Sequence, residues 1–309
     1  MKILLAHNFY GSASPSGENT VFHAEGGLLR QMGHEVLEFT RHSDTILGKG
    51  AAGTLEGALS TPWNPFSAQE LKRVLRRERP DILHVHNFFP LLSPSIFYAA
   101  SGSETATVMT LHNYRLFCAA GIPMRQGRPC TVCLETKSVR PALRFGCYRD
   151  SRSATTPMAA MIELHRILGT WKQHVDAFIS LSGFQKDLMS EAGLPKDKMY
   201  VKPQFYPNPP GAMPWNQRAD RVIFVGRLGE EKGVHCIIEA WRVWGKDAPH
   251  LEIIGDGPLR RTLEESVSEA RLEGTVSFRG QLPFEEVQRR LARGRLFLLP
   301  SLCFEGFPM

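Results

Sequence analysis

The sequence predicts an α/β protein built from two doubly wound domains, each an open, mostly parallel sheet covered by helices. Short, nearly uninterrupted apolar runs alternate with helical patterns along almost all of its 309 residues. Uninterrupted apolar strands are typical of parallel sheets, because such sheets are buried on both faces. The repeated strand–helix order favours this class over one in which strands and helices are segregated along the chain.

The elements follow from these patterns in chain order. The predicted strands are Lys2–His7, Glu35–Thr40, Asp81–Val85, Ala106–Leu111, Ala177–Leu181, Met199–Lys202, Arg221–Val225, Leu251–Ile254, Thr275–Phe278 and Leu296–Leu299. The predicted helices include Gly17–Met32, Ala68–Arg77, Pro157–Trp171, Gly233–Trp244, Pro258–Glu269 and Phe284–Ala292. Proline suits the first position of a helix, so Pro258 is expected there.

A proline-rich stretch divides the chain. Residues 203–218 contain five prolines and show no hydrophobic periodicity, which is typical of a linker between domains. We therefore expect one Rossmann-like domain over residues 1–207 and a second over residues 208–309. Ligands of open α/β sheets bind beyond the carboxyl ends of the strands. The residues that follow each strand are thus the candidates for function.

The composition excludes several classes of protein. With 42% hydrophobic and 22% charged residues, the chain is neither disordered nor of low complexity. No apolar run reaches the roughly 18 residues of a membrane-spanning helix, and the run Met1–His7 is too short for a signal peptide, so we expect a cytoplasmic protein. The net charge of +6 is local, because residues 115–152 carry eight Lys and Arg against two Asp and Glu.

The strand ends of the first domain carry small and polar residues. The first strand leads into a loop that ends at Gly17, where the free amides of a helix N-terminus attract phosphate or carboxylate. A plain turn explains this loop equally well. His7, His86 and His112 stand at the ends of three strands. A metal site is one interpretation, disfavoured because no acidic residue accompanies them at zinc-site spacing, and packed histidines are another. For His112 we favour a polar group directed at a substrate.

The basic segment over residues 114–152 interrupts the first domain and carries four cysteines. They are Cys118, Cys130, Cys133 and Cys147. A cytosolic chain keeps its thiols reduced, and Cys-x-x-Cys is half of a tetrahedral thiolate site, so structural zinc is the favoured interpretation. Free thiols and an iron–sulfur cluster remain alternatives. The positive charge suits nucleic acid, a phosphate-bearing acceptor or an anionic membrane surface.

The second domain carries a loop suited to a diphosphate. After the strand that ends at Val225, the loop from Gly226 to Gly233 holds Arg227 and Lys232. Two cations can bind phosphate oxygens while glycine lets the backbone approach. A solvated turn is the alternative interpretation of these charges. The last strand leads into Glu305–Pro308, and the sequence stops before the helix that would complete this unit.

In this order and spacing, the motifs resemble the family-4 retaining glycosyltransferases, which have the GT-B fold. The matching residues are Gly226-Arg227 with Glu231-Lys232-Gly233, Gly255-Asp256-Gly257-Pro258, Glu305-Gly306-Phe307-Pro308, His84-Val85-His86-Asn87 and Thr110-Leu111-His112-Asn113. The stretch from Tyr10 to Asn19 and the four-cysteine segment resemble a bacterial subgroup of that family. The resemblance covers nearly the whole chain.

The resemblance implies roles for residues of the second domain. Arg227 and Lys232 match the basic pair that binds the nucleotide-sugar diphosphate and stabilises its leaving charge, on the loop that begins at Gly226. Glu305 matches the first glutamate of the family's paired-glutamate motif, beside the donor sugar. The amides of Gly306 and Phe307 would contact sugar hydroxyls.

The same resemblance assigns two residues of the first domain. Gly17 would approach the diphosphate, and His112 matches the histidine near the anomeric carbon. Catalysis in the family needs no metal or other cofactor, so zinc would be structural only. The family's second glutamate would fall beyond Met309, so the chain resembles a C-terminally truncated enzyme, for which we do not expect full activity. Its final strand would then expose apolar surface.

We therefore expect a glycosyltransferase that moves a sugar with retention from a nucleotide-diphosphate sugar to a hydroxyl of a glycan or lipid-linked acceptor. The expected setting is bacterial surface polysaccharide or glycolipid assembly, in the cytoplasm with peripheral contact to the inner membrane surface and without nucleic acid. One alternative is a GT-B nucleotide-sugar epimerase, which needs no acceptor. Another is a zinc-bearing nucleic-acid or membrane adaptor, which leaves the loop with Arg227 and Lys232 unexplained.

Overall fold

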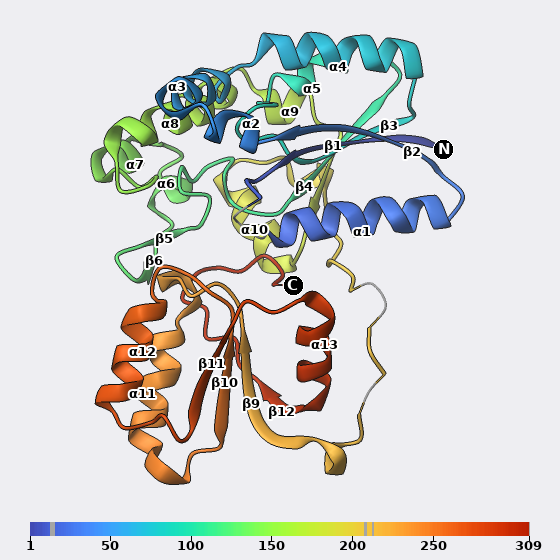
Figure 1. The fold of residues 1–309 in the computed structure, drawn as a ribbon. Helices are drawn as coiled ribbons and strands as arrows, with labels where there is room; N and C mark the ends of the chain where they lie inside the picture. The colour runs from blue at the N-terminus through green and yellow to red at the C-terminus, as the bar shows by residue number, and fades with distance from the viewer. Residues whose placement is uncertain (13–15, 207–208, 212, 309) are drawn as a thin grey trace. The chain divides into compact units, whose positions relative to one another are not determined.

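The computed structural model describes residues 1–12, 16–206, 209–211 and 213–308, which form two compact units (Figure 1). The first unit holds residues 1–123 and 130–205 together with the residues from Gly306 onward. The second holds Met124–Pro129 and Tyr206–Glu305. The predicted boundary between residues 207 and 208 lies outside the described residues.

A six-stranded parallel sheet forms the centre of the first unit. In spatial order its strands are β2 (Glu35–His42), β1 (Lys2–Phe9), β3 (Ile82–Asn87), β4 (Ala106–Leu111), β7 (Ala177–Ser180) and β8 (Met199–Val201). β1 and β3 are buried along nearly their whole length, as expected for strands that are covered on both faces.

Helices cover both faces of this sheet, with α1 and α10 on one face and α4 and α5 on the other (Figure 1). The helices of the first unit are α1 (Gly17–Gln31), α2 (Asp44–Leu47), α3 (Gly50–Ser60), α4 (Pro65–Glu78), α5 (Ile96–Ala99), α6 (Val132–Glu135), α7 (Arg140–Phe145), α8 (Arg152–Ile167), α9 (Thr170–Gln173) and α10 (Gly183–Ala192). A single 3₁₀ turn, Lys196–Lys198, precedes β8. The basic segment contributes α6 and α7.

Three predicted helix boundaries described next are wrong. The helix expected from Pro157 begins at Arg152, because the Ser151 side chain accepts a hydrogen bond from the Ala154 amide and caps it. It ends at Ile167, and Gly169, with φ of 63°, separates it from α9. Pro258 does not open its helix, because the Leu259 amide donates to the Leu228 carbonyl at 3.0 Å and holds this stretch in a turn.

The second unit is a four-stranded parallel sheet. In spatial order its strands are β11 (Val276–Gly280), β10 (His250–Ile254), β9 (Ala219–Val225) and β12 (Gly294–Phe297). The helices α11 (Val234–Trp244) and α12 (Arg260–Glu269) lie on one face, and α13 (Phe284–Arg293) lies on the other (Figure 1). Short 3₁₀ turns are Trp215–Gln217, Glu230–Lys232 and Gly245–Asp247, and β5 (Met124–Arg125) pairs antiparallel with β6 (Arg128–Pro129).

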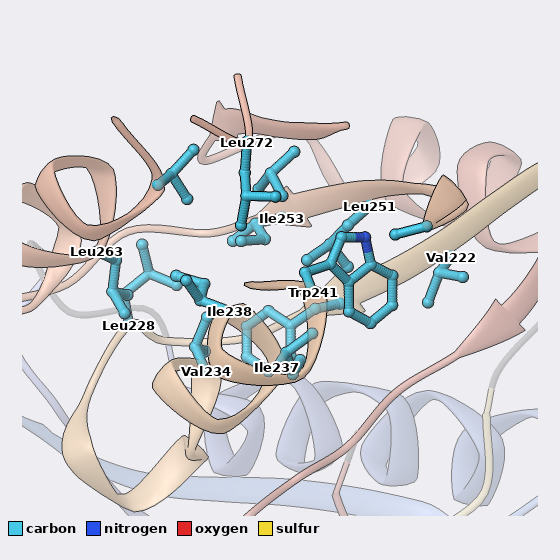
Figure 2. Packing of buried hydrophobic residues seen from close by; sticks show 14 residues of the cluster. Val222, Leu228, Val234, Ile237, Ile238, Trp241, Leu251, Ile253, Leu263 and Leu272 are labelled. Carbon is cyan, nitrogen blue, oxygen red and sulfur yellow. The ribbon is translucent and has the colours of Figure 1, made fainter. Parts of the chain in front are cut away.

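The core of the second unit lies between its sheet and the helices α11 and α12. Trp241 of α11 packs there with Leu251 and Ile253 of β10 (Figure 2). Burial of such large apolar side chains is the main stabilising contribution of a layer packed on a sheet. The predicted α/β class with two doubly wound, Rossmann-like sheets is thus confirmed. Among the described residues, no helix is long and apolar enough to cross a bilayer.

Candidate functional site

The strand order of the first unit reverses between β1 and β3, since β2 lies on one side of β1 and the later strands lie on the other. Ligands of open parallel sheets bind beyond the carboxyl ends at such a point. Three of the predicted histidines stand at these ends: His7 in β1, His86 in β3 and His112 directly after β4.

The structure connects two of these histidines by a hydrogen bond. His86 Nδ1 and His112 Nε2 are 3.1 Å apart, and Gln204 Nε2 lies 3.0 Å from His112 Nδ1. His7 instead pairs with Asn19 of α1, with 2.9 Å between Nε2 and Oδ1. The histidines of β3 and β4 therefore form one polar chain that reaches the segment after β8.

Burial keeps these imidazoles neutral at neutral pH. Desolvation lowers the pKa of His7 to about 4 and the pKa of His112 to about 3. A neutral imidazole acts through hydrogen bonds rather than through a fixed charge. Next to His112, a small pocket is lined by the ends of β3 and β4, among them Asn87, Thr110 and Asn113.

The sequence analysis did not identify a second set of polar residues at this edge of the sheet. Glu18 follows Gly17 at the start of α1, and Asn113 Nδ2 donates to its Oε1 at 2.9 Å. Burial raises the pKa of Glu18, and its Oε2 has no hydrogen-bond partner among the described residues. The guanidinium of Arg115 lies 4.4 Å from the ring centre of Phe89. A glutamate in the first turn of a glycine-led helix was the only sequence signal for this group.

Gly17 itself is the first residue of α1, as predicted. Ser16 caps the helix by accepting a hydrogen bond from the Glu18 amide. The remaining amides of this first turn are donors of the kind that bind anions. The loop residues 13–15 before the cap lie outside the described residues.

In the second unit, glycines bring two backbone loops into contact. A Cβ on Gly255, which has φ of 134°, would lie 1.9 Å from the Gly226 carbonyl oxygen. The Gly226 amide donates to the Ile254 carbonyl at 3.0 Å, and the Leu228 amide donates to the Asp256 carbonyl at 2.9 Å. The Gly-Asp-Gly turn after β10 thereby fixes the loop that carries Arg227.

The strand order of this sheet reverses between β9 and β12, and the structure brings two predicted residues together there. Lys232 Nζ lies 2.5 Å from Glu305 Oε1, and the Ser301 hydroxyl donates to the same oxygen at 2.7 Å. Each of the two charged side chains is about three-quarters buried, with 22% and 24% exposed. Gly233 permits this arrangement, because a Cβ there would lie 2.2 Å from the Pro300 carbonyl oxygen.

The remaining predicted residues of this region are placed separately. Arg227 is exposed on the same loop as Lys232. Gly306 belongs to the first unit, where a Cβ would lie 3.1 Å from Gln185 Nε2. Phe307 is 40% exposed. Gly17 and His112 also belong to the first unit.

The four cysteines are not gathered as one group of ligands. Each is half-buried, and in the described chain no three of them have sulfurs within 4.8 Å of one another. Burial raises the pKa of the Cys118 thiol to about 12 and also raises that of Cys133, whose neighbours include Cys130 and Cys147. Zinc binding at these thiols therefore stays a prediction, since a metal would have to deprotonate them.

The chain matches two descriptions of protein families. Residues 15–206 match "Glycosyltransferase Family 4", and residues 211–309 match "Glycosyl transferases group 1". A 2-deoxystreptamine glucosyltransferase of Streptomyces kanamyceticus is 35% identical over 255 residues, which are 79% of this chain and 59% of that protein. The amylovoran biosynthesis glycosyltransferase AmsK of Erwinia amylovora is 38% identical over 96 residues, 29% of this chain and 24% of that protein. The chain thus spans less than two thirds of the length of these relatives.

Solved structures share the fold. A glycosyltransferase from Rickettsia africae ESF-5 has a TM-score of 0.61 at 13% identity, and the match covers 97% of this chain and 73% of that one. Anabaena Alr3699/HepE in complex with UDP and glucose has a TM-score of 0.56 at 15% identity, covering 99% and 76%. At these identities the likeness establishes the GT-B type of fold alone.

Proposed function

Because the chain belongs to glycosyltransferase family 4, whose description matches residues 15–206, we propose that it transfers a glycosyl group from a nucleotide-diphosphate sugar to a hydroxyl acceptor with retention of configuration. The bond between the anomeric carbon and the diphosphate oxygen breaks, and a bond to the acceptor oxygen forms on the same face of the sugar. The acceptor's proton leaves with the diphosphate.

The observation that carries this proposal is the contact between Lys232 and Glu305 at the reversal point of the second sheet. Glu305 Oε1 accepts from both the Lys232 ammonium group and the Ser301 hydroxyl, so Lys232 remains near a fixed position. Arg227 on the same loop supplies a second, exposed cation. Together they would bind the diphosphate and stabilise the negative charge that develops as it departs.

The first unit supports the proposal through its hydrogen-bonding groups. A neutral His112 would hold a sugar hydroxyl near the anomeric carbon, and the amides of the first turn of α1, beginning at Gly17, would contact phosphate oxygens. The amides of Gly306 and Phe307 would bind further hydroxyls of the donor. Positioning and charge stabilisation would supply most of the rate enhancement, and we propose that the transfer step uses no metal.

We further propose a setting in surface polysaccharide or glycolipid assembly at the cytoplasmic membrane face. The support is the kinship with AmsK, a protein of amylovoran biosynthesis, and the basic segment. Arg140, Arg144 and Arg149 of that segment are exposed, as is 48% of Phe145. Exposed cations beside an aromatic ring suit an anionic lipid surface or a phosphate-bearing acceptor. The cysteines of this segment would bind a structural zinc.

The test is the transfer activity of Arg227→Ala and Lys232→Ala in the full-length protein. Each variant should lose transfer by about 100-fold to 1,000-fold, the cost of removing one group that stabilises developing charge. Thermal unfolding of Arg227→Ala should stay unchanged, because Arg227 is exposed, whereas Lys232→Ala should unfold at a slightly lower temperature because Glu305 loses its partner. Arg261→Ala on α12 is the matched control, since its side chain is 91% exposed, and it should keep full activity.

Two outcomes would contradict the proposal. A double variant at Arg227 and Lys232 with unaltered turnover of nucleotide sugars would remove the assigned roles. A product that forms without any acceptor would instead identify an epimerase. The anomeric configuration of the product, read by nuclear magnetic resonance, tests retention separately.

A further inference from the structure

Three buried side chains of the first unit face one another: Glu25 of α1 with His84 and His86 of β3. Their ligand atoms all lie within 4.8 Å of one another. Glu25 Oε1 is 3.8 Å from His84 Nδ1, and Glu25 Oε2 is 3.9 Å from His86 Nε2. Both separations are too long for hydrogen bonds. Two atoms that bind one ion at about 2.1 Å lie at most about 4.2 Å apart, so both fit a shared ion.

The other ring nitrogen of each histidine is held by a neighbour. His84 Nε2 is 2.8 Å from the Thr110 hydroxyl, and His86 Nδ1 is 3.1 Å from His112 Nε2. Histidines that bind metals are oriented in this way, through a hydrogen bond to the nitrogen that does not bind the ion. Because β3 is extended, His84 and His86 at positions i and i+2 also point to the same face.

One atom of the group has no partner. His86 Nε2 is buried without a hydrogen bond among the described residues, and the side chain is fully enclosed. A buried ring nitrogen without a partner costs free energy that a bound ligand would recover. This atom faces Glu25, which is itself only 8% exposed.

We propose that Glu25, His84 and His86 form a binding site for a divalent transition-metal ion, with Zn²⁺ as the first candidate. Two imidazoles and a carboxylate are a donor set that such ions prefer over Mg²⁺ or Ca²⁺. The ion would join α1 to β3 beside the reversal point of the sheet. This site is separate from the four cysteines and does not depend on the proposed transferase function.

The ammonium group of Lys202 would compete with the ion for the Glu25 carboxylate. Its Nζ lies 3.4 Å from Glu25 Oε1, and 47% of its side chain is exposed. The ammonium group and the ion would compensate the same carboxylate, so binding would move Lys202 towards solvent. Lys202→Met should therefore bind the ion more tightly than the wild type.

Occupancy would also set the proton positions next to the site. With an ion on Nε2, His86 keeps its proton on Nδ1 and donates it to His112 Nε2. His112 then carries its proton on Nδ1, and the Gln204 amide presents its oxygen instead of its nitrogen. The ion would thus select one tautomer of His112.

The experiment is a Co²⁺ titration of the full-length, chelator-treated protein in a Cys133→Ser background, which removes the thiol whose neighbours include Cys130 and Cys147. We expect one Co²⁺ per chain by native mass spectrometry, with visible d–d bands and no sulfur-to-cobalt charge-transfer band. For Zn²⁺, X-ray absorption should give nitrogen or oxygen neighbours at about 2.0–2.1 Å rather than sulfur at about 2.3 Å.

Variants then separate this site from others. His86→Gln and Glu25→Gln should abolish the Co²⁺ bands, and Thr110→Val should weaken binding by about 10-fold to 100-fold. His235→Gln, the same change at an exposed position of α11, should bind like the background. If the Cys133→Ser protein binds no Co²⁺, or if His86→Gln binds it unchanged, the proposal is wrong. The first of these outcomes is read on a protein whose three proposed ligands are intact, and circular dichroism before the titration verifies that this background is folded.

Discussion

Gly255 illustrates how a single residue fixes the geometry of the loop from Gly226 to Gly233. Its φ of 134° lies in the region that favours glycine, and the Gly226 carbonyl oxygen occupies the place of a side chain. The close contact lets the amides of Gly226 and Leu228 bond to the neighbouring turn. Backbone packing therefore requires the Gly-Asp-Gly turn, in addition to any role of its glycines in letting a ligand approach.

We expect Gly255→Ala to lower the free energy of unfolding by about 2–4 kcal/mol, because it combines a strained φ with a backbone clash. Urea unfolding followed by circular dichroism measures this change. Gly274→Ala is the control, since an added Cβ there has nothing within 4 Å, and it should stay within about 0.5 kcal/mol of the wild type. Equal stability of the two variants would contradict the role of close packing.

His165 of α8 should make the free energy of unfolding depend on pH. Its Nδ1 lies 2.8 Å from the Thr170 hydroxyl and its Nε2 lies 2.9 Å from the Pro62 carbonyl oxygen. Burial lowers the pKa of His165. Because the unfolded chain binds this proton more readily, stability is complete above the ordinary histidine pKa near 6.5 and is lost as the pH falls below it.

The wild type should therefore lose stability more steeply than His165→Gln between pH 6.5 and 5. The difference in slope is at most about 1.4 kcal/mol per pH unit, the value for one proton. Urea unfolding at a series of pH values measures both slopes. Parallel slopes for the two proteins would show that His165 titrates normally in the folded state.

At the scale of elements, β12 is the least protected strand of the second sheet. It lies at the edge of the described sheet, and Leu296 and Phe297 are 54% and 50% exposed. Neighbouring residues of a strand point to opposite faces, so apolar side chains are exposed on both faces. An exposed apolar edge is a site for self-association.

We expect Phe297→Lys to reduce self-association of the 309-residue chain, because a charge at a strand edge opposes pairing. Light scattering over a range of protein concentrations measures the effect. Phe66→Lys on α4 is the matched control, since Phe66 is 81% exposed but lies on a helix. A similar reduction by both variants would indicate a general effect of charge rather than a property of the β12 edge.

At the scale of the molecule, the positive charge is not evenly distributed along the chain. The first 207 residues carry 23 Lys and Arg against 17 Asp and Glu, whereas the rest is balanced with 14 of each. Not all of this charge is on the surface, because the Arg115 guanidinium lies over the rings of Phe89 and Tyr148. The exposed part includes Arg140 and Arg144.

The proposed membrane contact predicts salt-dependent binding to vesicles that contain phosphatidylserine. Replacing Arg140, Arg144 and Arg149 with Gln should weaken co-sedimentation by about 100-fold at low salt, at about 1 kcal/mol per charge near the surface. The matched control replaces Lys72, Arg73 and Arg76, which are exposed on α4, and should bind like the wild type. Equal loss in both triple variants would point to net charge alone.

The sequence by itself determined the fold class and the alternation of strands and helices along the chain, but not the spatial order of the strands in either sheet. Apolar runs such as Ala106–Leu111 reappear as strands at the same residues, because burial on both faces of a sheet leaves a local, readable pattern. It was less able to place helix ends: the helix expected from Pro157 begins at Arg152, since its start depends on the Ser151 side chain accepting from the Ala154 amide.

The candidate site also has a part that the sequence shows and a part that only the tertiary structure shows. The glycine loop with Arg227 and Lys232 was visible in the sequence because its chemistry is local. The contact of Lys232 with Glu305, 73 positions apart, is one that only the tertiary structure decided. So is the meeting of Glu25 with His84 and His86. The sequence analysis considered a metal only at His7, His86 and His112 and disfavoured it, because no acidic residue accompanies them at zinc-site spacing. Parallel strands place distant residues at one edge, and no local pattern records which helix residue will face them.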